Sequence, residues 1–377
     1  MRILVLADEI YPDAVGGVAK SVFNECAAWV RAGHEVTVVV RCLRADLSDR
    51  SKVEGVDIIR FLGLMRGSWL YRLYPFSIVY HVWRWLRRNS GTYDVIYLQT
   101  PLYMLPVALA GARDHAPVVY TFYVPVGAEV RIGAERGKYG RLGLFARAVA
   151  VLFDAIERWA LCLADCVVPR SAFALDQLRQ QCDLAVSLVP DELIPLGVDT
   201  SYYAPCDRAS ARSRLALPTD RPILLTVRRL EGRMGLSNLI EAMTIVRERY
   251  PNVLLLIAGK GYLRSTLDVL VDQHGLSDNV RLLGFVDEAD LPAYLAAADL
   301  FVLPTELLEG FGLSTIEALA VGLPVVGTPV GATPEILSPI DPALLSWDAS
   351  PIGLAEAICY WLNHPADLAV LSTRCRA

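Results

Sequence analysis

The sequence of 377 residues lacks any run that fits a membrane-spanning or secretory segment. The uncharged stretch 95–112 is interrupted by two prolines and carries a polar Gln99–Thr100 pair, so strand, loop and helix start fit it better than a spanning helix. Near the N-terminus, only five apolar residues separate Arg2 from Asp8, which is too short for a signal-peptide core. We therefore expect a cytoplasmic protein.

Cysteine pairs, histidine clusters and metal-binding acidic motifs are also missing. Eight cysteines are scattered along the chain, and only Cys162 and Cys166 lie close together, which favours buried thiols in a reducing compartment over a metal site or a disulfide framework. The chain has no D-x-D pair to hold a diphosphate through a metal, and no G-x-x-x-x-G-K-[ST] loop to make the "DEAD" run at Asp287–Asp290 a helicase motif. We therefore predict neither a bound metal nor a cofactor.

A strong excess of one charge is absent as well. The net charge is −5 and the pI is about 5.6, so the composition gives no reason to expect nucleic-acid binding, and any anion site must be local. Apolar residues make up 54% of the chain and charged residues 20%, which excludes a disordered or fibrous protein. The length suits two domains rather than one.

The chain does contain a regular alternation of short β-branched runs with amphipathic segments, which is typical of parallel sheets wrapped by helices. The alternation stops near 189–205, where prolines and Gly197 interrupt the pattern, and then restarts. We predict an α/β protein of two tandem Rossmann-like, doubly wound domains, over 1–192 and 193–350, with a helical tail over 351–377. The predicted strands are Arg2–Ala7, Glu35–Val40, Val56–Phe61, Val95–Leu98, Val118–Thr121, Cys166–Pro169, Ile223–Val227, Val253–Ala258, Val280–Leu283, Leu300–Leu303 and Pro324–Gly327. The predicted helices are Gly17–Ala32, Leu236–Tyr250, Tyr262–His274, Glu288–Ala298 and Gly312–Val321.

The densest chemistry follows the predicted strand that ends at Leu303. The turn Gly310-Phe311-Gly312-Leu313 lets the main chain approach a phosphate, and the helix that starts there offers unpaired N–H groups at the positive end of its dipole. Glu309 and Glu317 bracket this turn, so one carboxylate could accept both hydroxyls of a ribose while the other orients a sugar. The alternative is a plain helix start, with one acidic residue that complements the dipole and one that faces water.

A second cluster directly follows the predicted strand 223–227, and ligands of open α/β sheets bind at such strand ends. Arg228, Arg229 and Arg233 stand within six residues, and arginine forks pair bidentately with phosphate oxygens, which suits a diphosphate leaving group. A solvated basic loop is the alternative. The next strand runs into Gly259-Lys260-Gly261, which resembles the start of a glycine-rich nucleotide turn but lacks its third glycine.

Three weaker signals lie in the first half. Gly16 and Gly17 follow the first strand, where they either permit close approach of a ligand or form a plain turn. Tyr123 stands at another strand end, where packing is a more common explanation than chemistry. The segment Trp69–Arg88 is rich in Trp, Tyr and Arg, which fits either contact with a membrane surface or a core helix whose arginines reach water.

Taken together, these motifs resemble family 4 of the retaining glycosyltransferases, whose fold (GT-B) places two Rossmann-like domains face to face across a cleft. The resemblance covers about residues 1–350 and is most specific from "VRRL" through "IAGKG" and "AADLFVLPT" to "LEGFGLSTIEALAVGLPVVGTPVGATPE". It implies a transferase that moves a hexosyl group from a nucleoside-diphosphate sugar to a hydroxyl of a sugar or lipid-linked acceptor, with an acceptor domain followed by a donor domain.

The resemblance also implies roles for individual residues. Arg229 and Arg233 would pair with the diphosphate, together with Arg228; Glu317 would hold the ribose. Glu309 would hold the transferred sugar, together with the Phe311–Leu313 backbone. Four further positions complete the expected donor site: Phe285 and Val286 beside the base, Gly17 facing the phosphate or the acceptor, and Gly259. The expected catalytic residues are Glu309, Arg229 and Tyr123.

The chain departs from the family pattern at several positions. Tyr123 stands where members usually have a histidine beside the anomeric carbon, and Met234 stands where they usually have a lysine. We expect the tail 351–377 to be a shortened form of the helix with which family members return to the first domain. Two alternatives stay open: a donor-binding protein with weak or no transferase activity, which Tyr123 favours, and a nucleotide-sugar epimerase of the same fold.

Overall fold

The structure is a computed structural model that describes residues 1–14, 16–44, 46–62, 74–181 and 193–376. The chain divides into two compact units: unit 1 comprises residues 1–128 and 148–196, and unit 2 comprises residues 129–147 and 197–377. The domain boundaries expected at 192/193 and 350/351 stay a prediction. None of the helices among the described residues combines the length and the apolar character needed to cross a bilayer.

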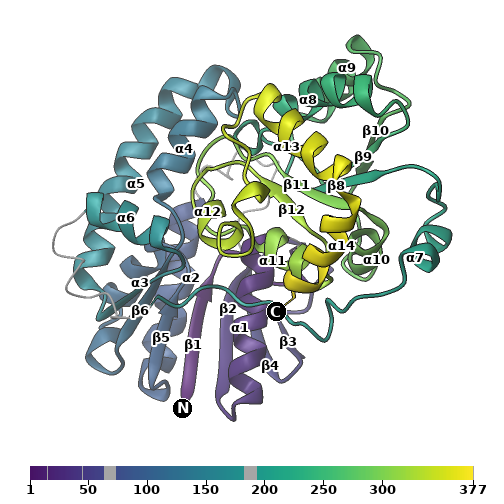
Figure 1. Ribbon diagram of the computed structural model, residues 1–377. Helices are drawn as coiled ribbons and strands as arrows, with labels where there is room; N and C mark the ends of the chain where they lie inside the picture. The colour runs from purple at the N-terminus through teal and green to yellow at the C-terminus, as the bar shows by residue number, and fades with distance from the viewer. Residues whose placement is uncertain (15, 45, 63–73, 182–192, 377) are drawn as a thin grey trace. The chain divides into compact units, whose positions relative to one another are not determined.

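Unit 1 contains a seven-stranded sheet in the order β3-β4-β2-β1-β5-β6-β7, parallel except for the β3–β4 pair (Figure 1). Its strands are β1 (Arg2–Ala7), β2 (Glu35–Cys42), β3 (Arg50–Val53), β4 (Val56–Leu62), β5 (Val95–Leu98), β6 (Val118–Phe122) and β7 (Cys166–Pro169). Its helices are α1 (Gly17–Arg31), α2 (Tyr74–Asn89), α3 (Met104–Leu109) and α6 (Ala172–Gln181); α4 (Val126–Glu135) and α5 (Gly143–Leu163) have residues in both units.

Both faces of the unit 1 sheet are covered because its central strand is apolar on both sides. Leu4 and Leu6 of β1 belong to a core with Ile78, Val82 and Leu86, which recur every fourth residue along α2. The alternate residues of β1 belong to a second core with the inner face of α1. A run of apolar residues without polar alternation is what a parallel strand buried on both faces requires.

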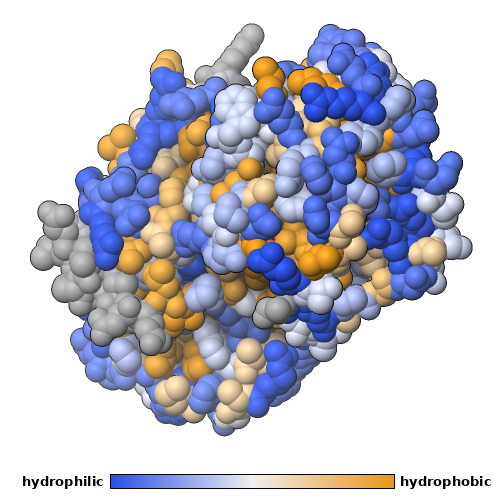
Figure 2. Space-filling view, viewed as in Figure 1, coloured by the Kyte–Doolittle hydropathy of each residue, from blue (hydrophilic) through white to orange (hydrophobic). Residues whose placement is uncertain are grey.

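Unit 2 contains a five-stranded parallel sheet in the order β10-β9-β8-β11-β12. Its strands are β8 (Ile223–Val227), β9 (Leu254–Ala258), β10 (Val280–Gly284), β11 (Leu300–Leu303) and β12 (Val325–Gly327). Its helices are α7 (Arg208–Arg214), α8 (Leu236–Arg249), α9 (Arg264–Gln273), α10 (Leu291–Ala297), α11 (Leu313–Ala320), α12 (Thr333–Leu337), α13 (Pro351–Asn363) and α14 (Pro365–Arg374). Hydrophilic side chains predominate over α7 and α9 on the face that Figure 2 shows.

The predicted fold class, with two Rossmann-like parallel sheets, is confirmed. The last helices pack into unit 2, since Ile358 and Trp361 of α13 and Leu371 of α14 are buried in the same core as β8 and β11. In both sheets the strand order reverses beside the first strand of the unit, between β1 and β5 and between β8 and β11. Ligands of doubly wound sheets bind at the carboxyl ends of the strands at such a switch point, so each unit has one favoured place for a ligand.

Candidate functional site

The switch point of unit 2 gathers the two motifs that the sequence analysis singled out. β8 and β11 are parallel neighbours, with Leu224 opposite Leu300, so the residues that follow both strands emerge at the same edge of the sheet. Arg228 and Arg229 follow β8, and the loop that carries Glu309 follows β11. The fold therefore brings together groups that lie about eighty residues apart in the chain.

Arg228 and Glu309 form a buried ion pair at this edge. Nη2 of Arg228 donates to Oε2 of Glu309, and the Thr305 hydroxyl donates to the same oxygen at 2.7 Å. The Glu309 side chain is only 10% exposed and that of Arg228 only 6%. Burial alone would raise the pKa of Glu309, but the charge and hydrogen bond of Arg228, with the Thr305 hydroxyl, hold that pKa below its usual value. Glu309 is therefore a carboxylate at neutral pH.

Two guanidinium groups of this cluster have unused N–H donors. Nη1 of Arg228 and Nε of Arg233 are buried, and neither has a hydrogen-bond partner within the described part of the chain. Arg233 also donates from Nη1 to the Leu308 carbonyl at 2.8 Å, which places its guanidinium next to Glu309. Buried donors without partners are costly, and an anion is the ligand that would satisfy them best.

The glycine turn leads directly into α11. Gly312 has a left-handed backbone (φ 85°) and precedes the first helical residue, so a residue with a side chain would be strained there. Phe311 and Leu313 are buried, and Glu317 is buried on α11 at 5% exposure. The Glu317 charge, after burial itself, raises the pKa of the buried Tyr203 hydroxyl. No side chain of the described residues caps the start of α11, and the Thr315 N–H donates to the Gly312 carbonyl at 2.9 Å.

Arg229 and Arg233 also contact an acidic side chain of the same unit, Glu129. Glu129 Oε1 accepts from Arg229 at 3.3 Å and from Arg233 at 3.2 Å. Burial alone would raise the pKa of Glu129. The nearby cations, Arg233 most strongly, lower it by more, so the pKa of Glu129 lies below its usual value. A diphosphate that binds these two arginines therefore competes with the Glu129 carboxylate for the same N–H groups.

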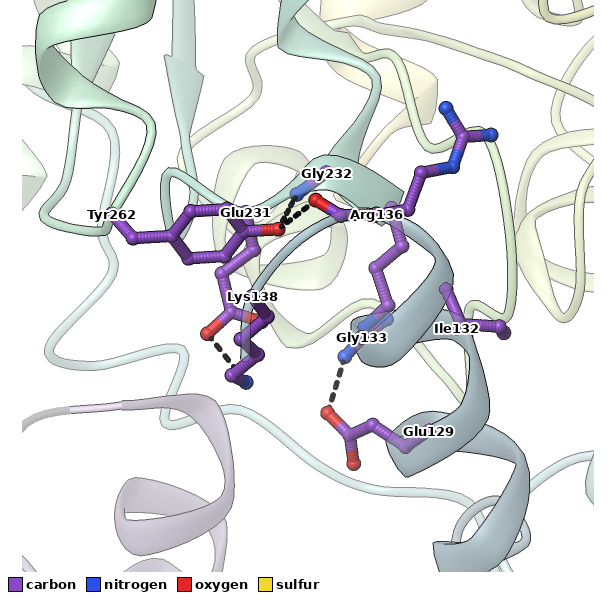
Figure 3. Close-up of a pocket in the computed structure, with 9 residues that line it drawn as sticks. Glu129, Ile132, Gly133, Arg136, Lys138, Glu231, Gly232 and Tyr262 are labelled. Carbon is purple, nitrogen blue, oxygen red and sulfur yellow. Dashed lines mark hydrogen bonds and ion pairs between the residues drawn. The ribbon is translucent and has the colours of Figure 1, made fainter. Parts of the chain in front are cut away.

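Figure 3 shows the neighbourhood of Glu129. Lys138 points to Glu231, with Nζ 3.1 Å from its carboxylate, and the Tyr262 hydroxyl accepts from the Gly232 N–H at 3.0 Å. The cavity enclosed by these side chains measures about 10 Å³, enough for roughly one water molecule but not for a nucleotide. This cavity lies beside the arginine cluster and is too small to be a substrate pocket.

The other predicted donor residues lie at the ends of the neighbouring strands. Phe285 and Val286 follow β10; Phe285 is 39% exposed, and Lys260 Nζ lies 4.5 Å from its ring. Gly259 follows β9 with a φ of 145°, and a Cβ there would lie 1.7 Å from the Arg228 carbonyl oxygen. Gly259 therefore permits the close approach of the β9 loop to the residue that pairs with Glu309.

Gly331 permits a close backbone approach to Glu309, as Gly259 does to Arg228. Substitution of Gly331 gives our first prediction. Its φ is 61°, and a Cβ would lie 2.1 Å from the Glu309 carbonyl oxygen. Gly331→Ala should lower the free energy of unfolding by about 2–4 kcal/mol, because the backbone is strained and Glu309 must move. Thermal denaturation measures this, with Gly197→Ala as the matched control, since Gly197 has open space around its Cβ position. Equal melting temperatures for the two variants would contradict the prediction.

Two predicted site residues, Gly17 and Tyr123, belong to unit 1. Gly17 is the first residue of α1. The Tyr123 hydroxyl lies 3.3 Å from Ser21 Oγ and donates to Gln99 Oε1 at 3.2 Å. Burial, reinforced by the nearby Glu25 carboxylate, raises the pKa of Tyr123 to about 12. Tyr123 therefore carries a neutral hydroxyl at neutral pH.

Sequence reasoning assigned no role to several residues that contact these groups. Glu129 lies in an amphipathic helix about one hundred residues before the arginines it pairs with, and Thr305 lies four residues before Glu309. The sequence contained one indication of an acidic partner elsewhere in the chain, namely the excess of arginines over acidic residues near β8. In unit 1, Gln99 follows β5 at a strand end, and that position was the one available signal for it.

Comparison with known proteins covers nearly the whole chain. The family model of glycosyl transferases group 1 matches residues 207–376, and that of glycosyltransferase family 4 matches residues 15–202. A GDP-mannose-dependent monoacylated alpha-(1-6)-phosphatidylinositol monomannoside mannosyltransferase of Corynebacterium glutamicum is 32% identical over 195 residues, which are 49% of this chain and 50% of that protein. This chain thus spans about half of that relative's length in the match.

Two further proteins match over nearly the whole of this chain. A glycogen synthase of Mycobacterium tuberculosis is 28% identical over 97% of this chain and 87% of that enzyme. Among solved structures, a sucrose-phosphate synthase of Thermosynechococcus elongatus superposes with a TM-score of 0.81 at 24% identity, covering 100% of this chain and 93% of that one. The latter likeness shows the fold.

Proposed function

The chain belongs to the family 4 glycosyltransferases and has their GT-B fold, and from that premise we propose that it is a retaining hexosyltransferase. Its donor is a nucleoside-diphosphate sugar bound by unit 2. Its acceptor is a hydroxyl group of a sugar or of a lipid-linked molecule bound by unit 1. No cofactor takes part, and the donor is itself the activated substrate.

The observation that carries this proposal is the buried Arg228–Glu309 pair at the switch point of unit 2, beside the unused N–H donors of Arg228 and Arg233. A diphosphate supplies the anion that these donors lack, and a sugar hydroxyl can donate to the Glu309 carboxylate. In the proposed complex Arg229 and Arg233 bind the diphosphate. The other predicted contacts keep their assigned roles: Glu317 on the ribose, Gly310 to Leu313 on the sugar and phosphate, Phe285 and Val286 near the base, and Gly259 and Gly17 as close backbone approaches.

In the proposed reaction the departing donor phosphate accepts the proton of the acceptor hydroxyl on the same face of the sugar, so the anomeric configuration is retained. This step needs a stabilised diphosphate more than a strong protein base. Cationic side chains and backbone N–H groups at a helix start provide that stabilisation without a metal. Glu309 and Arg229 act on the donor, while Tyr123 serves as a protonated hydrogen-bonding group on the acceptor side.

A lipid-linked acceptor would bring the protein to a membrane surface, and we propose that α2 makes that contact. Residues 69–73 of the predicted segment Trp69–Arg88 lie outside the described residues. On α2, Phe76 is 73% exposed and Tyr80, one turn later, is 49% exposed. Arg84 Nη1 donates to the Tyr80 hydroxyl at 3.2 Å, and the Arg87 guanidinium lies 5.9 Å from the Trp83 ring. Exposed rings beside cations suit an anionic headgroup layer.

The double variant Phe76→Ser, Tyr80→Ser should therefore bind phosphatidylglycerol-containing vesicles about tenfold more weakly, because it loses two rings that would otherwise be buried among lipids. Vesicle sedimentation measures the partitioning. Tyr360→Ser is the matched control, because Tyr360 is 47% exposed on α13 of unit 2. Binding that both variants retain equally would contradict the membrane contact.

The proposed function is tested by thermal-shift screening against UDP-, GDP- and dTDP-sugars, followed by mass spectrometry of donor alone and of donor with acceptor. A stabilising donor whose sugar appears on an acceptor supports the transferase. Binding without turnover, restored by Tyr123→His, would support the donor-binding alternative. Conversion of the donor sugar without any acceptor would support the epimerase.

A further inference from the structure

Residues 129–138 make a contact within unit 2 that the donor-binding roles proposed above do not explain. They comprise the second part of α4 and the turn that follows it, and we call them the α4 end segment. The chain leaves unit 1 after Ala128 and returns to it at Ala148, so this segment belongs to unit 2, as does the loop that follows β8. Three of its charged side chains, Glu129, Arg136 and Lys138, contact that loop or the loop that follows β11.

Two cations of the α4 end segment pair with acidic residues beside the arginine cluster. Arg136 Nη2 forms an ion pair with Glu306, and Lys138 Nζ lies 3.1 Å from the Glu231 carboxylate (Figure 3). The two stretches of backbone also lie close together, because a Cβ on Gly232 would lie 2.7 Å from the Cβ of Arg136. The segment is therefore held against the loop after β8 by two ion pairs and by close packing.

Glu129 adds a contact of the opposite polarity, on the arginines themselves. Its Oε1 accepts from Nη2 of Arg229 at 3.3 Å and from Nη2 of Arg233 at 3.2 Å. Although burial opposes ionisation, Arg233 and Arg229 hold the pKa of Glu129 below its usual value, so the group is a carboxylate at neutral pH. A carboxylate oxygen between two guanidinium groups takes the place that a phosphate oxygen would take. Glu129 therefore occupies N–H groups that the proposed function assigns to the diphosphate.

The Glu129 contact is weak enough to be exchanged for another anion. Strong hydrogen bonds between charged groups measure about 2.7–2.9 Å, whereas both Glu129 contacts are longer and fall on a single oxygen. The Glu129 side chain is 34% exposed and that of Arg229 is 52% exposed, so water reaches both groups. A diphosphate has more acceptor oxygens and more negative charge than a carboxylate, so it should bind the two arginines more strongly.

Glu129 and a diphosphate cannot occupy these arginines together. The cavity that the α4 end segment and the loop enclose beside Arg233 has a volume of about 10 Å³, so a diphosphate fits there only after the segment has moved. A phosphate beside an ionised carboxylate would also be repelled by it. Binding of the donor and docking of Glu129 are therefore mutually exclusive.

We propose that the α4 end segment is an autoinhibitory element of the donor site: Glu129 occupies Arg229 and Arg233 in the donor-free protein, and the diphosphate of the donor displaces it and releases the segment. The inference rests on the proposed function, because it describes the regulation of the same site. Since Glu129 is part of the same chain, its local concentration is high at any donor concentration. The donor binds only those molecules in which the arginines are free, which raises its apparent dissociation constant by the reciprocal of their fraction.

Calorimetric titration of the full chain with inorganic pyrophosphate and with UDP tests the competition. Glu129→Gln keeps the shape of the side chain and removes its charge, so both ligands should bind about three- to tenfold more tightly than to the wild type. The factor should be the same for both ligands, because only the diphosphate competes with Glu129. Glu135→Gln is the matched control, since it removes an equal charge from an exposed position of the same helix and should change the affinity less than about 1.5-fold. If Glu129→Gln binds pyrophosphate no more tightly than Glu135→Gln does, the proposal is overturned.

Amide hydrogen exchange on the wild-type chain tests the release of the segment without any variant. Saturating pyrophosphate should speed up the exchange of residues 130–138 at least about threefold and slow that of residues 228–235, because the segment loses a contact while the loop gains a ligand. Unchanged or slower exchange in the segment would overturn its release.

The same titrations separate this inference from the proposed function. Equal diphosphate binding by the wild type and by Glu129→Gln would remove the autoinhibition and leave the donor site standing. Failure of both proteins to bind pyrophosphate, UDP or any sugar nucleotide would remove the donor site and the autoinhibition with it. Binding by Glu129→Gln alone would support both.

Discussion

Glu309→Gln should lower kcat about 100- to 1,000-fold, since in the proposed complex the carboxylate accepts from the transferred sugar, and it balances the charge of Arg228. The amide keeps the size of the side chain but cannot compensate the guanidinium, whose side chain is only 6% exposed. The same variant should also lose about 3–5 kcal/mol of unfolding free energy, because a buried charge is left without its partner. Turnover with saturating donor and chemical denaturation measure the two effects.

A double variant separates catalysis from folding. Arg228→Met combined with Glu309→Gln removes both charges, so the free energy of unfolding should recover most of what the single variant loses. Turnover should stay low, because the group that holds the sugar is still absent. A Glu309→Gln variant that keeps more than about a third of the wild-type kcat would contradict the role of Glu309.

Arg233→Met should raise the dissociation constant of the donor about 10- to 100-fold. A hydrogen bond from a charged group contributes roughly 1.5–3 kcal/mol, and every 1.4 kcal/mol corresponds to about a factor of ten. The Arg233 side chain is only 11% exposed, so solvent screens its charge little. Calorimetric titration with the sugar nucleotide that stabilises the protein best provides the measurement.

Variants of Arg229 and Arg214 are compared with Arg233→Met for their effect on donor affinity. Arg229 is 52% exposed, so Arg229→Met should weaken donor binding less than Arg233→Met, and added salt should reduce its effect. Arg214 is 60% exposed on α7, where it pairs with Asp290, and Arg214→Met should leave the donor affinity unchanged. Equal affinities of the Arg233 and Arg214 variants would show that the cluster does not bind the diphosphate.

Much of the candidate donor site is visible in the chain because its parts are local. Arg228, Arg229 and Arg233 occur within six residues after one strand, and Glu309, the glycine turn and Glu317 occur within nine residues after another. The turn needs glycine at 312 for its left-handed backbone, which is a property of the nearest few residues. Because such short patterns depend on neighbouring residues, they can be recognised from the sequence alone.

Other contacts could not be predicted from the sequence. Glu129 is one hundred residues from Arg229, and nothing in its helix indicates which cation it meets. Gln99 is twenty-four residues from Tyr123. A glutamine at a strand end does not by itself indicate a cavity, yet Gln99 lines one with Asp8 and Arg41. At Tyr123, where the resemblance led us to expect a histidine, the structure shows a hydroxyl that donates to Gln99 Oε1.

The sequence by itself determined the class of fold, the two chemical clusters of unit 2 and the family, because alternating apolar runs and short strand-end motifs depend on neighbouring residues. Only the tertiary structure decided which arginine faces Glu309, which arginines face Glu129, and that Asp8, Arg41 and Gln99 share one cavity. The reason is the order of strands in each sheet: β1 adjoins β5, and β8 adjoins β11, across long stretches of intervening chain. Strand order arises from the packing of the entire unit, and no local pattern contains it.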